Sequence, residues 1–316
     1  MINDLDTQYC QLLGQLIKDG EASADRTGTG TQMIFGHQMK FDLRDGFPLL
    51  TTKKTSFRLI LTELLWFVSG QTNILPLLQQ RNHIWTEWPY KRWTESNSYT
   101  GNKPAVGTQA YKDEMREFEN MILKDSEFAR TWGELGPVYG HQWRNYGGYC
   151  DERGSEPNTG IDQLSEALEL LKNDPSSRRI IVDSWNPKDL PKQALPPCHM
   201  FFQMNITDEY VDLSFMMRSS DVFLGLPYNI ASYALLLMMI AKEIGKTPRY
   251  LVYTGQNVHL YKNHFEQAKQ QLTHQQDHYP LPSVTIADKP LFELTAEDFT
   301  LTNYQSHEKI QAPVAV

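Results

Sequence analysis

The sequence predicts an α/β fold in one domain that carries an inserted lobe. Short apolar runs at 38–43, 200–206, 211–217 and 251–254 are typical of buried strands. Segments with apolar residues at helical spacing lie between them, and 226–240 is apolar nearly all round, which predicts a central helix. A chain of 316 residues without an internal repeat or clear linker can bury one large core.

The N-terminal third is expected to supply two helices and the first strand. Apolar spacing predicts a helix over 2–19, with Gly20 as its C-cap. The loop 25–31, rich in glycine and threonine, could hold a phosphate through its backbone N–H groups. A plain turn is the alternative, because no P-loop lysine follows. The strand at 38–43 and a helix at 57–69 come next.

The middle of the chain is interrupted by a polar segment at about 89–132, which we expect to form the inserted lobe. A helix at 161–172 and a strand at 179–184 follow, and Arg178 and Arg179 stand where this strand begins. After the strand at 251–254, the pattern from Gln256 onward is interpreted as the start of another helix.

Composition restricts the class of protein. The formal net charge of −8 argues against bulk nucleic-acid binding, so any phosphate site must be local. Three cysteines without paired spacing predict neither a disulfide framework nor a zinc site. The longest apolar run is too short to span a bilayer, and polar residues interrupt the start of the chain. We therefore expect a cytoplasmic protein without a resident metal.

Cys198 is the candidate nucleophile. Two prolines precede it and fix its approach, and a strand-like run follows it. His199 and nearby arginines, Arg218 among them, would favour the thiolate, which is the nucleophilic form. The alternative is a buried structural cysteine, since free cysteine is among the most buried residue types.

Glu63 and Asn229 are candidates for chemistry and for recognition. Glu63 lies within an otherwise apolar helical run, where burial would raise its pKa and suit it to general acid–base work. The alternative is a carboxylate at a helix edge that faces water. Asn229 lies in the first turns of the apolar helix, where its amide needs partners. It would serve either as a structural cap or as a ligand-reading group.

A series of motifs along the chain resembles the thymidylate synthase family, including the longer insertion of some bacterial members. The resemblance runs in order from about residue 25 to residue 316. The motifs are Arg26-Thr-Gly-Thr-Gly, Phe47-Pro-Leu-Leu-Thr-Thr-Lys-Lys, Glu63-Leu-Leu-Trp-Phe, Leu135-Gly-Pro-Val-Tyr-Gly, Ser177-Arg-Arg, Pro196-Pro-Cys-His, Arg218-Ser-Ser-Asp, Phe223-Leu-Gly-Leu-Pro-Tyr-Asn-Ile, His259-Leu-Tyr and the terminal Ala-Pro-Val-Ala-Val.

The resemblance implies a fold and a reaction. The fold would be a large mixed β-sheet flanked by helices, with two sheets packed face to face in a homodimer. The reaction would convert dUMP to dTMP, with 5,10-methylenetetrahydrofolate supplying the carbon and a hydride and leaving as dihydrofolate. Cys198 would attack C6 of uracil, and Glu63 would move protons through water. Tyr139 would help to remove the C5 proton, and Trp85 would shape the hydride-transfer pocket.

The resemblance also implies two sets of binding residues. Arg178 and Arg179 of the partner subunit would join the nucleotide set, and Asn229 would bond N3–H and O4 of uracil. The dUMP-binding set is Arg26, Arg178, Arg179, Arg218, Ser219, Asp221, Asn229, His259 and Tyr261. The folate-binding set is Lys53, Trp85, Asp221, Gly225 and Val316.

Departures from the family pattern keep two alternatives open. Met217 stands where a glutamine is usual, Asn257 where an aspartate is, and Asp183 where a small neutral residue is. None removes a group that the covalent chemistry requires. One alternative is a dUMP hydroxymethylase on the same fold. The other is a non-catalytic nucleotide- or RNA-binding homologue, against which Cys198 and Glu63 both argue.

Overall fold

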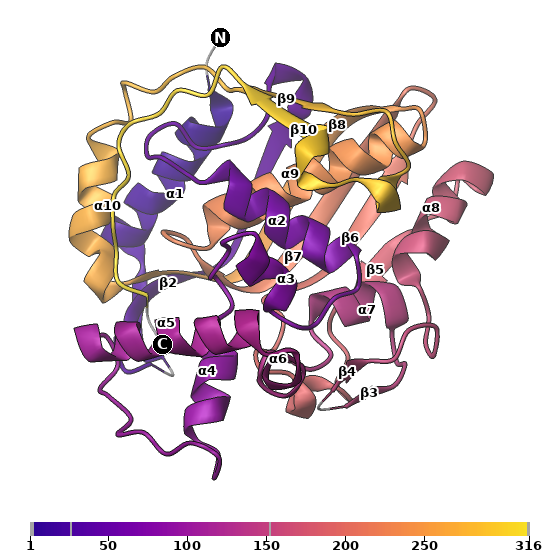
Figure 1. The fold of residues 1–316 in the computed structure, drawn as a ribbon. Helices are drawn as coiled ribbons and strands as arrows, with labels where there is room; N and C mark the ends of the chain where they lie inside the picture. The colour runs from indigo at the N-terminus through magenta and orange to yellow at the C-terminus, as the bar shows by residue number, and fades with distance from the viewer. Residues whose placement is uncertain (1–2, 26, 152, 315–316) are drawn as a thin grey trace. The chain divides into compact units, whose positions relative to one another are not determined.

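The computed structural model describes residues 3–25, 27–151 and 153–314 (Figure 1). The chain divides into two compact units. The first unit holds Met1–Leu61, Ala167–Ile181 and Cys198–Val316, and the second holds Thr62–Glu166 and Val182–Pro197. The boundary falls within one strand and two helices, so each unit is assembled from separate stretches of sequence.

The helices and strands follow the order that the sequence predicts, apart from one region. The helices are α1 (Asp4–Asp19), α2 (Phe57–Val68), α3 (Leu75–Gln79), α4 (Glu87–Thr94), α5 (Gln109–Lys124), α6 (Ser126–Trp132), α7 (Tyr139–Asn145), α8 (Gln163–Asn173), α9 (Leu226–Glu243) and α10 (Phe265–Leu272). The strands are β1 (Glu21–Ser23), β2 (Thr31–Asp42), β3 (Cys150–Asp151), β4 (Gly154–Ser155), β5 (Ile181–Asp183), β6 (His199–Ile206), β7 (Tyr210–Asp221), β8 (Thr247–Tyr261), β9 (Ser283–Ile286) and β10 (Phe299–Thr302).

The central feature is a mixed sheet of six strands in the order β1-β2-β8-β7-β6-β5. Strands β7 and β8 are parallel, and they are joined through α9, as a parallel pair requires. Strands β2 and β6 lie antiparallel to β8 and β7 respectively. This arrangement confirms the expected α/β fold with a large mixed sheet flanked by helices.

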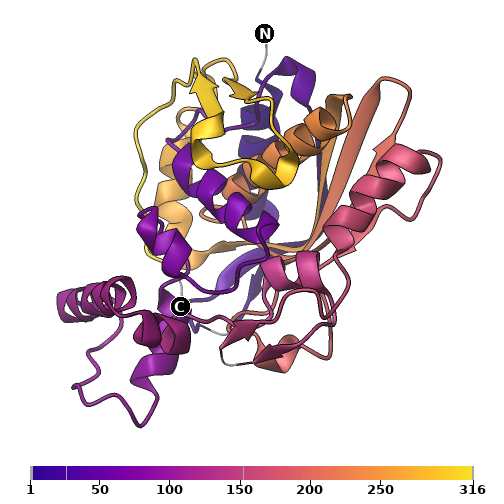
Figure 2. The ribbon, with the colours of Figure 1, turned by 45° about the vertical axis from the view of Figure 1, so that its right-hand side comes forward.

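One face of the sheet is buried by helices and the other is not. Helices α1 and α9 pack against β2, β7 and β8, and Figure 2 shows α9 on one side of these strands. The paired residues Phe41, Leu251 and Leu213 are buried on this covered face. Their neighbours Lys40 and Val252 point the other way and are exposed or half-buried. We call this second surface the open face.

The sheet edges are short or covered. Both outermost strands, β1 and β5, have only three residues. In β2, Gly36 has a φ of 84°, in the left-handed region that glycine tolerates, and it pairs with no residue of β8. Further along β2, the Gln8 side chain of α1 donates to the carbonyl of Lys40 at 2.9 Å and accepts from its N–H at 3.3 Å. A side-chain amide thus takes the place of a neighbouring strand.

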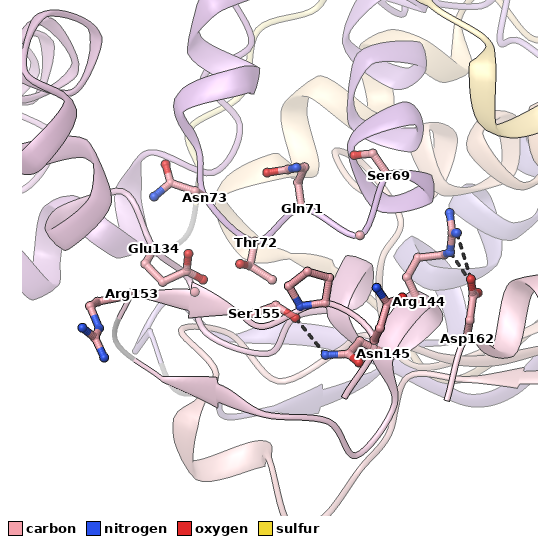
Figure 3. A pocket seen from close by; sticks show the side chains of 14 residues that line it. Ser69, Gln71, Thr72, Asn73, Glu134, Arg144, Asn145, Arg153, Ser155 and Asp162 are labelled. Atoms are coloured by element: carbon pink, nitrogen blue, oxygen red, sulfur yellow. Dashed lines mark hydrogen bonds and ion pairs between the residues drawn. The ribbon is translucent and has the colours of Figure 1, made fainter. Parts of the chain in front are cut away.

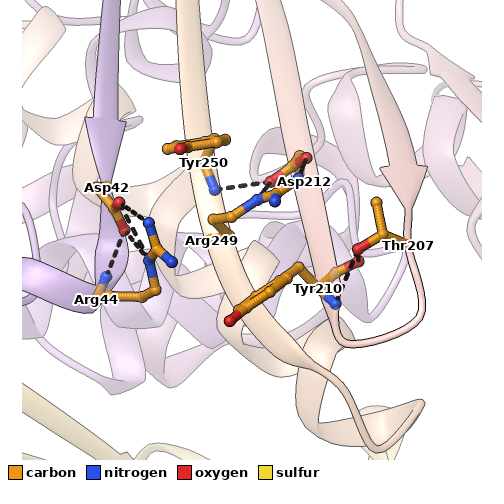
Figure 4. Close-up of polar contacts among 7 residues, drawn as sticks. All are labelled: Asp42, Arg44, Thr207, Tyr210, Asp212, Arg249 and Tyr250. Carbon is orange, nitrogen blue, oxygen red and sulfur yellow. Dashed lines mark hydrogen bonds and ion pairs between the residues drawn. The ribbon is translucent and has the colours of Figure 1, made fainter.

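A cluster of charges and rings closes one end of the open face (Figure 4). Arg249 binds the Asp212 carboxylate at 2.7 Å and lies 4.8 Å and 4.7 Å from the ring centres of Tyr210 and Tyr250. Arg44 binds Asp42 in the same way. The Arg44 hydrogen bond holds the pKa of Asp42 below its usual value. The cluster pairs each exposed arginine with a carboxylate.

The second unit contains the segment expected to be an inserted lobe. Helices α4, α5 and α6 lie there and share an aromatic core in which Trp93 packs on Phe118 and Phe128. Ring centroids are 5.4 Å and 5.9 Å apart in these two pairs. The polar sequence of this segment therefore surrounds a small, well-packed helical core.

One expected element is wrong. The helix expected from Gln256 is the second half of β8, and the next α-helix, α10, begins only at Phe265. Residues 255–261 pair with β2 on one side and with β7 over residues 255–259 on the other. Hydrogen bonds to two neighbouring strands outweigh the weak local pattern.

Candidate active site

Several predicted nucleotide-binding residues, Ser219, Asp221 and His259 among them, lie at one end of the sheet. Because β7 and β8 are parallel, their carboxyl ends reach the same edge. The register sets Ser219 opposite Asn257, and Asp221 opposite His259. The loop 27–30 joins them, since the N–H of Lys262 donates to the carbonyl of Gly30 at 3.0 Å.

Cys198 lies at this same end, in the bend that leads into β6. Its carbonyl accepts from the N–H of Arg218 at 2.9 Å, and the half-buried residue is not in a disulfide. Burial raises the thiol pKa, although the Arg218 charge acts to lower it. Arg218 thus acts on the thiol in the expected direction, and burial has the larger effect on its pKa.

His199 contributes no positive charge to the thiol. The ring is buried, and burial lowers its pKa to about 3. Its Nδ1 lies 2.7 Å from the hydroxyl of Tyr233 on α9. His199 is therefore a neutral core residue that links β6 to α9, and Arg218 is the cation that acts on Cys198.

Asn229 is placed by the start of α9. Gly225 is the N-cap residue, no side chain caps the helix, and the N–H of Asn229 donates to the carbonyl of Gly225 at 3.1 Å. The half-buried side-chain amide makes no hydrogen bond with the described part of the chain. A half-buried amide without a protein partner favours the ligand-reading role over the structural cap.

Asp221 and Lys53 lie at the turn between β7 and α9. The Oδ1 atom of Asp221 accepts from the N–H groups of Phe223 and Leu224, at 3.0 Å and 3.2 Å. Lys53 is buried, donates to the carbonyl of Phe223, and lies 3.5 Å from the centre of the Phe223 ring. Burial lowers the pKa of Lys53 to about 7. The turn thus uses one oxygen of Asp221 and leaves Oδ2 for a ligand.

Asp6 supports Lys53, and the sequence analysis missed it. This carboxylate is buried and accepts from the N–H and hydroxyl groups of both Thr51 and Thr52, at 2.7 to 3.3 Å. The sequence signal that could have identified Asp6 is an acidic residue on the apolar face of the first helix, next to Leu5. A buried carboxylate needs such donors, so it fixes the loop that precedes Lys53.

Two arginines of the nucleotide set lie on the surface. Arg178 and Arg179 are exposed, and neither side chain forms an ion pair with the described residues. Arg26 and Val316 lie outside the described residues. Asp25, beside Arg26, accepts from the N–H groups of Thr27 and Gly30 at 2.8 Å and 2.6 Å, which shapes the loop 27–30.

The second unit holds Glu63, Trp85 and Tyr139 together. The indole Nε1 of Trp85 donates to Oε1 of Glu63 at 2.8 Å. Burial raises the pKa of Glu63 to about 7, against the lowering effect of that hydrogen bond. The rings of Trp85 and Tyr139 are 6.1 Å apart, with Phe67 4.9 Å from Tyr139. The structure thus supports the raised-pKa carboxyl over a water-facing one.

Comparison with known proteins identifies the family of the chain. The sequence model of the family described as thymidylate synthase matches residues 7–316. Thymidylate synthases of Listeria monocytogenes serotype 4b and Listeria innocua serovar 6a are 43% and 42% identical over 321 residues, which cover 98% of this chain and 99% of theirs. The chain belongs to the thymidylate synthase family. It is therefore a methyltransferase that converts dUMP to dTMP, and enzymes of this family use methylenetetrahydrofolate as co-substrate.

A cavity in the second unit is not part of the thymidylate synthase residue set. It encloses about 330 Å³ (Figure 3), and none of the predicted site residues line it. Arg144 and Asp162 on its wall bind each other at 2.8 Å, and Glu134 accepts from the N–H of Gly136 at 3.0 Å. Its polar groups thus serve the unit's own structure.

The described residues hold neither a cluster of metal-binding side chains nor a membrane-spanning helix. Within 3–25, 27–151 and 153–314, three or more histidine, cysteine or acidic side chains nowhere gather as a metal site would require. None of the helices in these ranges has the length and apolar character needed to cross a membrane.

Proposed function

We propose that this thymidylate synthase family member acts through a covalent bond between Cys198 and C6 of dUMP. 5,10-Methylenetetrahydrofolate would supply carbon and hydride and leave as dihydrofolate. Two observations support the proposal. Cys198 lies beside Arg218 at one end of the sheet, and Asn229 begins the helix that follows β7, with a side-chain amide that makes no hydrogen bond with the described residues. A nucleophile, a phosphate-binding cation and a base-reading amide are what covalent chemistry on a nucleotide needs.

The binding roles follow from side-chain chemistry. Arg218 and Ser219 hold the phosphate, and Asn229 offers uracil an acceptor for N3–H and a donor for O4. His259 and Tyr261 meet the ribose hydroxyl. Lys53, Asp221, Gly225, Trp85 and the terminal Val316 serve the folate, and Arg26 joins the phosphate set.

Glu63 is the proposed proton carrier. With a pKa of about 7 it is half protonated near neutral pH, so it can both give and take a proton. The Trp85 indole fixes Oε1, which leaves Oε2 to act through water. Tyr139 assists removal of the C5 proton. Cys198 forms the S–C6 bond after losing its proton, a loss that Arg218 favours.

We also propose a homodimer formed through the open face. The open face has half-buried apolar residues such as Val252 and Met216, and strand β2 carries Phe35, which is 74% exposed. An exposed apolar surface on a sheet is a candidate interface. Arg178 and Arg179 of the partner subunit would then bind the phosphate, which gives these exposed arginines an anion.

The whole chain, including the lobe at about 89–132, is proposed to act as one functional domain in the cytoplasm. The cysteines Cys10, Cys150 and Cys198 are all free, which suits a reducing compartment.

Product identification tests the proposal. The protein is incubated with dUMP and 5,10-methylenetetrahydrofolate, and nucleotide and folate products are identified by mass. We expect dTMP and dihydrofolate. Hydroxymethyl-dUMP with tetrahydrofolate would instead show a hydroxymethylase, and dUMP binding without a product would show a non-catalytic homologue.

Cys198→Ser should bind dUMP and lose turnover, because a hydroxyl does not ionise near neutral pH as a thiol can. Cys150→Ser, at another free cysteine, is the matched control and should remain active. Turnover of Cys198→Ser within about tenfold of the parent, a barrier change of only about 1.4 kcal/mol, would contradict the nucleophile assignment.

A further inference from the structure

Asn257 and His259 form a contact within strand β8 that fixes a proton. The Nδ1 atom of His259 lies 2.9 Å from Oδ1 of Asn257 and 3.3 Å from the backbone carbonyl oxygen of the same residue. A backbone carbonyl only accepts hydrogen bonds, and so does an amide oxygen. Nδ1 must therefore carry the hydrogen, and in a neutral ring the lone pair is on Nε2.

The second ring nitrogen has no protein partner. Nε2 makes no hydrogen bond with the described residues, although the side chain is only 7% exposed. Val258, between the two residues, is buried and points to the opposite side of the strand. The ring therefore presents one unused acceptor at the end of the sheet where Ser219 and Asp221 lie.

The groups around His259 shift its pKa in opposite directions. Burial lowers its pKa, and His264 on the following turn acts the same way. Asp221 on β7 and Asp25 in the loop before β2 raise it, as does the carbonyl of Asn257. Tyr261 packs edge-on at 5.2 Å. The net effect is a lowered pKa, so the ring is neutral around pH 7.

We propose that Asn257 is a positioning residue that keeps His259 neutral, with the lone pair on Nε2, so that the ring accepts a hydrogen bond from the sugar 3′-hydroxyl of the nucleotide. This inference rests on the proposed function, which places the ribose at His259. The argument turns on a feature of this sequence, an asparagine where the family pattern has an aspartate. An aspartate would accept the same Nδ1–H but would add a negative charge next to the ring.

The charge decides which form of the ring dominates. A carboxylate in contact with a histidine favours the imidazolium, and such neighbours shift a pKa by about 1–3 units. In the imidazolium both nitrogens donate, so Nε2 can no longer accept. The amide of Asn257 supplies the same geometry without this pull, which makes recognition of the hydroxyl insensitive to pH around neutrality.

The variant Asn257→Asp tests the inference by dUMP affinity, measured by calorimetry at pH 8 and at pH 6. Dividing each variant value by the parent value at the same pH cancels the titration of the dUMP phosphate. We expect the ratio of dissociation constants to rise by up to about tenfold on going to pH 6. A carboxylate in contact with the ring raises its pKa by about 1–3 units, and each unit corresponds to a tenfold change in the neutral form once the pH lies below the pKa.

Two controls isolate the hydroxyl contact. Gln256→Glu adds the same charge one residue away, where strand alternation turns the side chain to the opposite face. Its ratio of dissociation constants to the parent should be the same at pH 8 and pH 6. The 2′,3′-dideoxy analogue of dUMP lacks the hydroxyl, so its ratio for Asn257→Asp should also be independent of pH.

The protonation state of the His259 ring is measured by ¹⁵N NMR of the protein without ligand, and His259→Gln is used to assign the signal. We expect an unprotonated Nε2 in the parent from pH 8 down to pH 6, and a titrating ring in Asn257→Asp. A parent ring that titrates in this range, or an Nε2 that carries the hydrogen, would overturn the inference. If NMR shows the expected form of the ring but the ratio of dissociation constants does not change with pH, the proposed role of His259 in recognition would be overturned. Absence of dTMP formation would refute only the proposed function, since binding and NMR need no turnover.

Discussion

Replacing Glu63 by glutamine should remove a large pH dependence of stability. The pKa of Glu63 rises from 4.5, the ordinary value, to about 7 in the folded protein because of burial. The folded state therefore holds its proton more tightly than the unfolded state. This preference stabilises the fold fully below pH 4.5, and the contribution is lost as pH rises towards 7. A difference of about 2.5 pKa units corresponds to about 3 kcal/mol. Glutamine does not titrate and should show no such loss.

The assay is urea unfolding of the parent and Glu63→Gln from pH 4.5 to pH 8, at one protein concentration because self-association would make the apparent stability depend on concentration. The unfolding free energy of the parent should fall by about 3 kcal/mol relative to the variant across this range. Glu117→Gln, at an exposed position on α5, is the control and should leave the difference near zero. A difference between parent and Glu63→Gln that does not change with pH would refute the claim that Glu63 is buried in a form that prefers its proton.

Three further outcomes follow from the site. Trp85→Phe removes a hydrogen bond that lowers the pKa of Glu63. The part of the pH profile of kcat that reports Glu63 should therefore move to higher pH by about one unit. A profile that does not move would show that Glu63 is not the titrating group. Mixing Arg179→Ala with Cys198→Ser should restore activity once subunits exchange, since some hybrid dimers regain one intact site, and hybrids without recovery would exclude a shared site. Asn229→Asp should lose dUMP turnover and gain dCMP binding in a competition assay, because mismatched buried groups cost about 1–3 kcal/mol each; an unchanged dUMP preference would place specificity elsewhere.

Helices α1, α2, α8 and α9 were predictable because their signals are local. The apolar spacing of the first helix and the glycine after it gave an end at Asp19, and the structure shows Gly20 as the C-cap. The second half of β8 was not predictable in this way. Its pairing with β2 and β7 joins residues far apart in sequence, and no local pattern around Gln256 reports on them.

The candidate site shows the same division. A carboxylate in an apolar run was enough to predict the raised pKa of Glu63, because burial is the main cause. The state of the Cys198 thiol depends on a balance between burial and the charge of Arg218, and sequence gives no measure of either. His199 is adjacent to the thiol in sequence, yet its ring turns to Tyr233. Adjacent residues on a strand point to opposite faces, so being next to Cys198 in sequence does not bring the His199 ring to the thiol.

The treatment of the sheet edges has a consequence for how the protein self-associates. An unpaired strand edge is a template on which another chain can add a strand, and repeated addition produces fibrils. Here β1 is three residues long, Gly36 has a left-handed φ within β2, and the amide of Gln8 binds the backbone of Lys40. These features oppose growth along the hydrogen-bonding direction at β2. In the proposed dimer, contact across the face of the sheet would end after one partner, because that partner would cover the surface it binds.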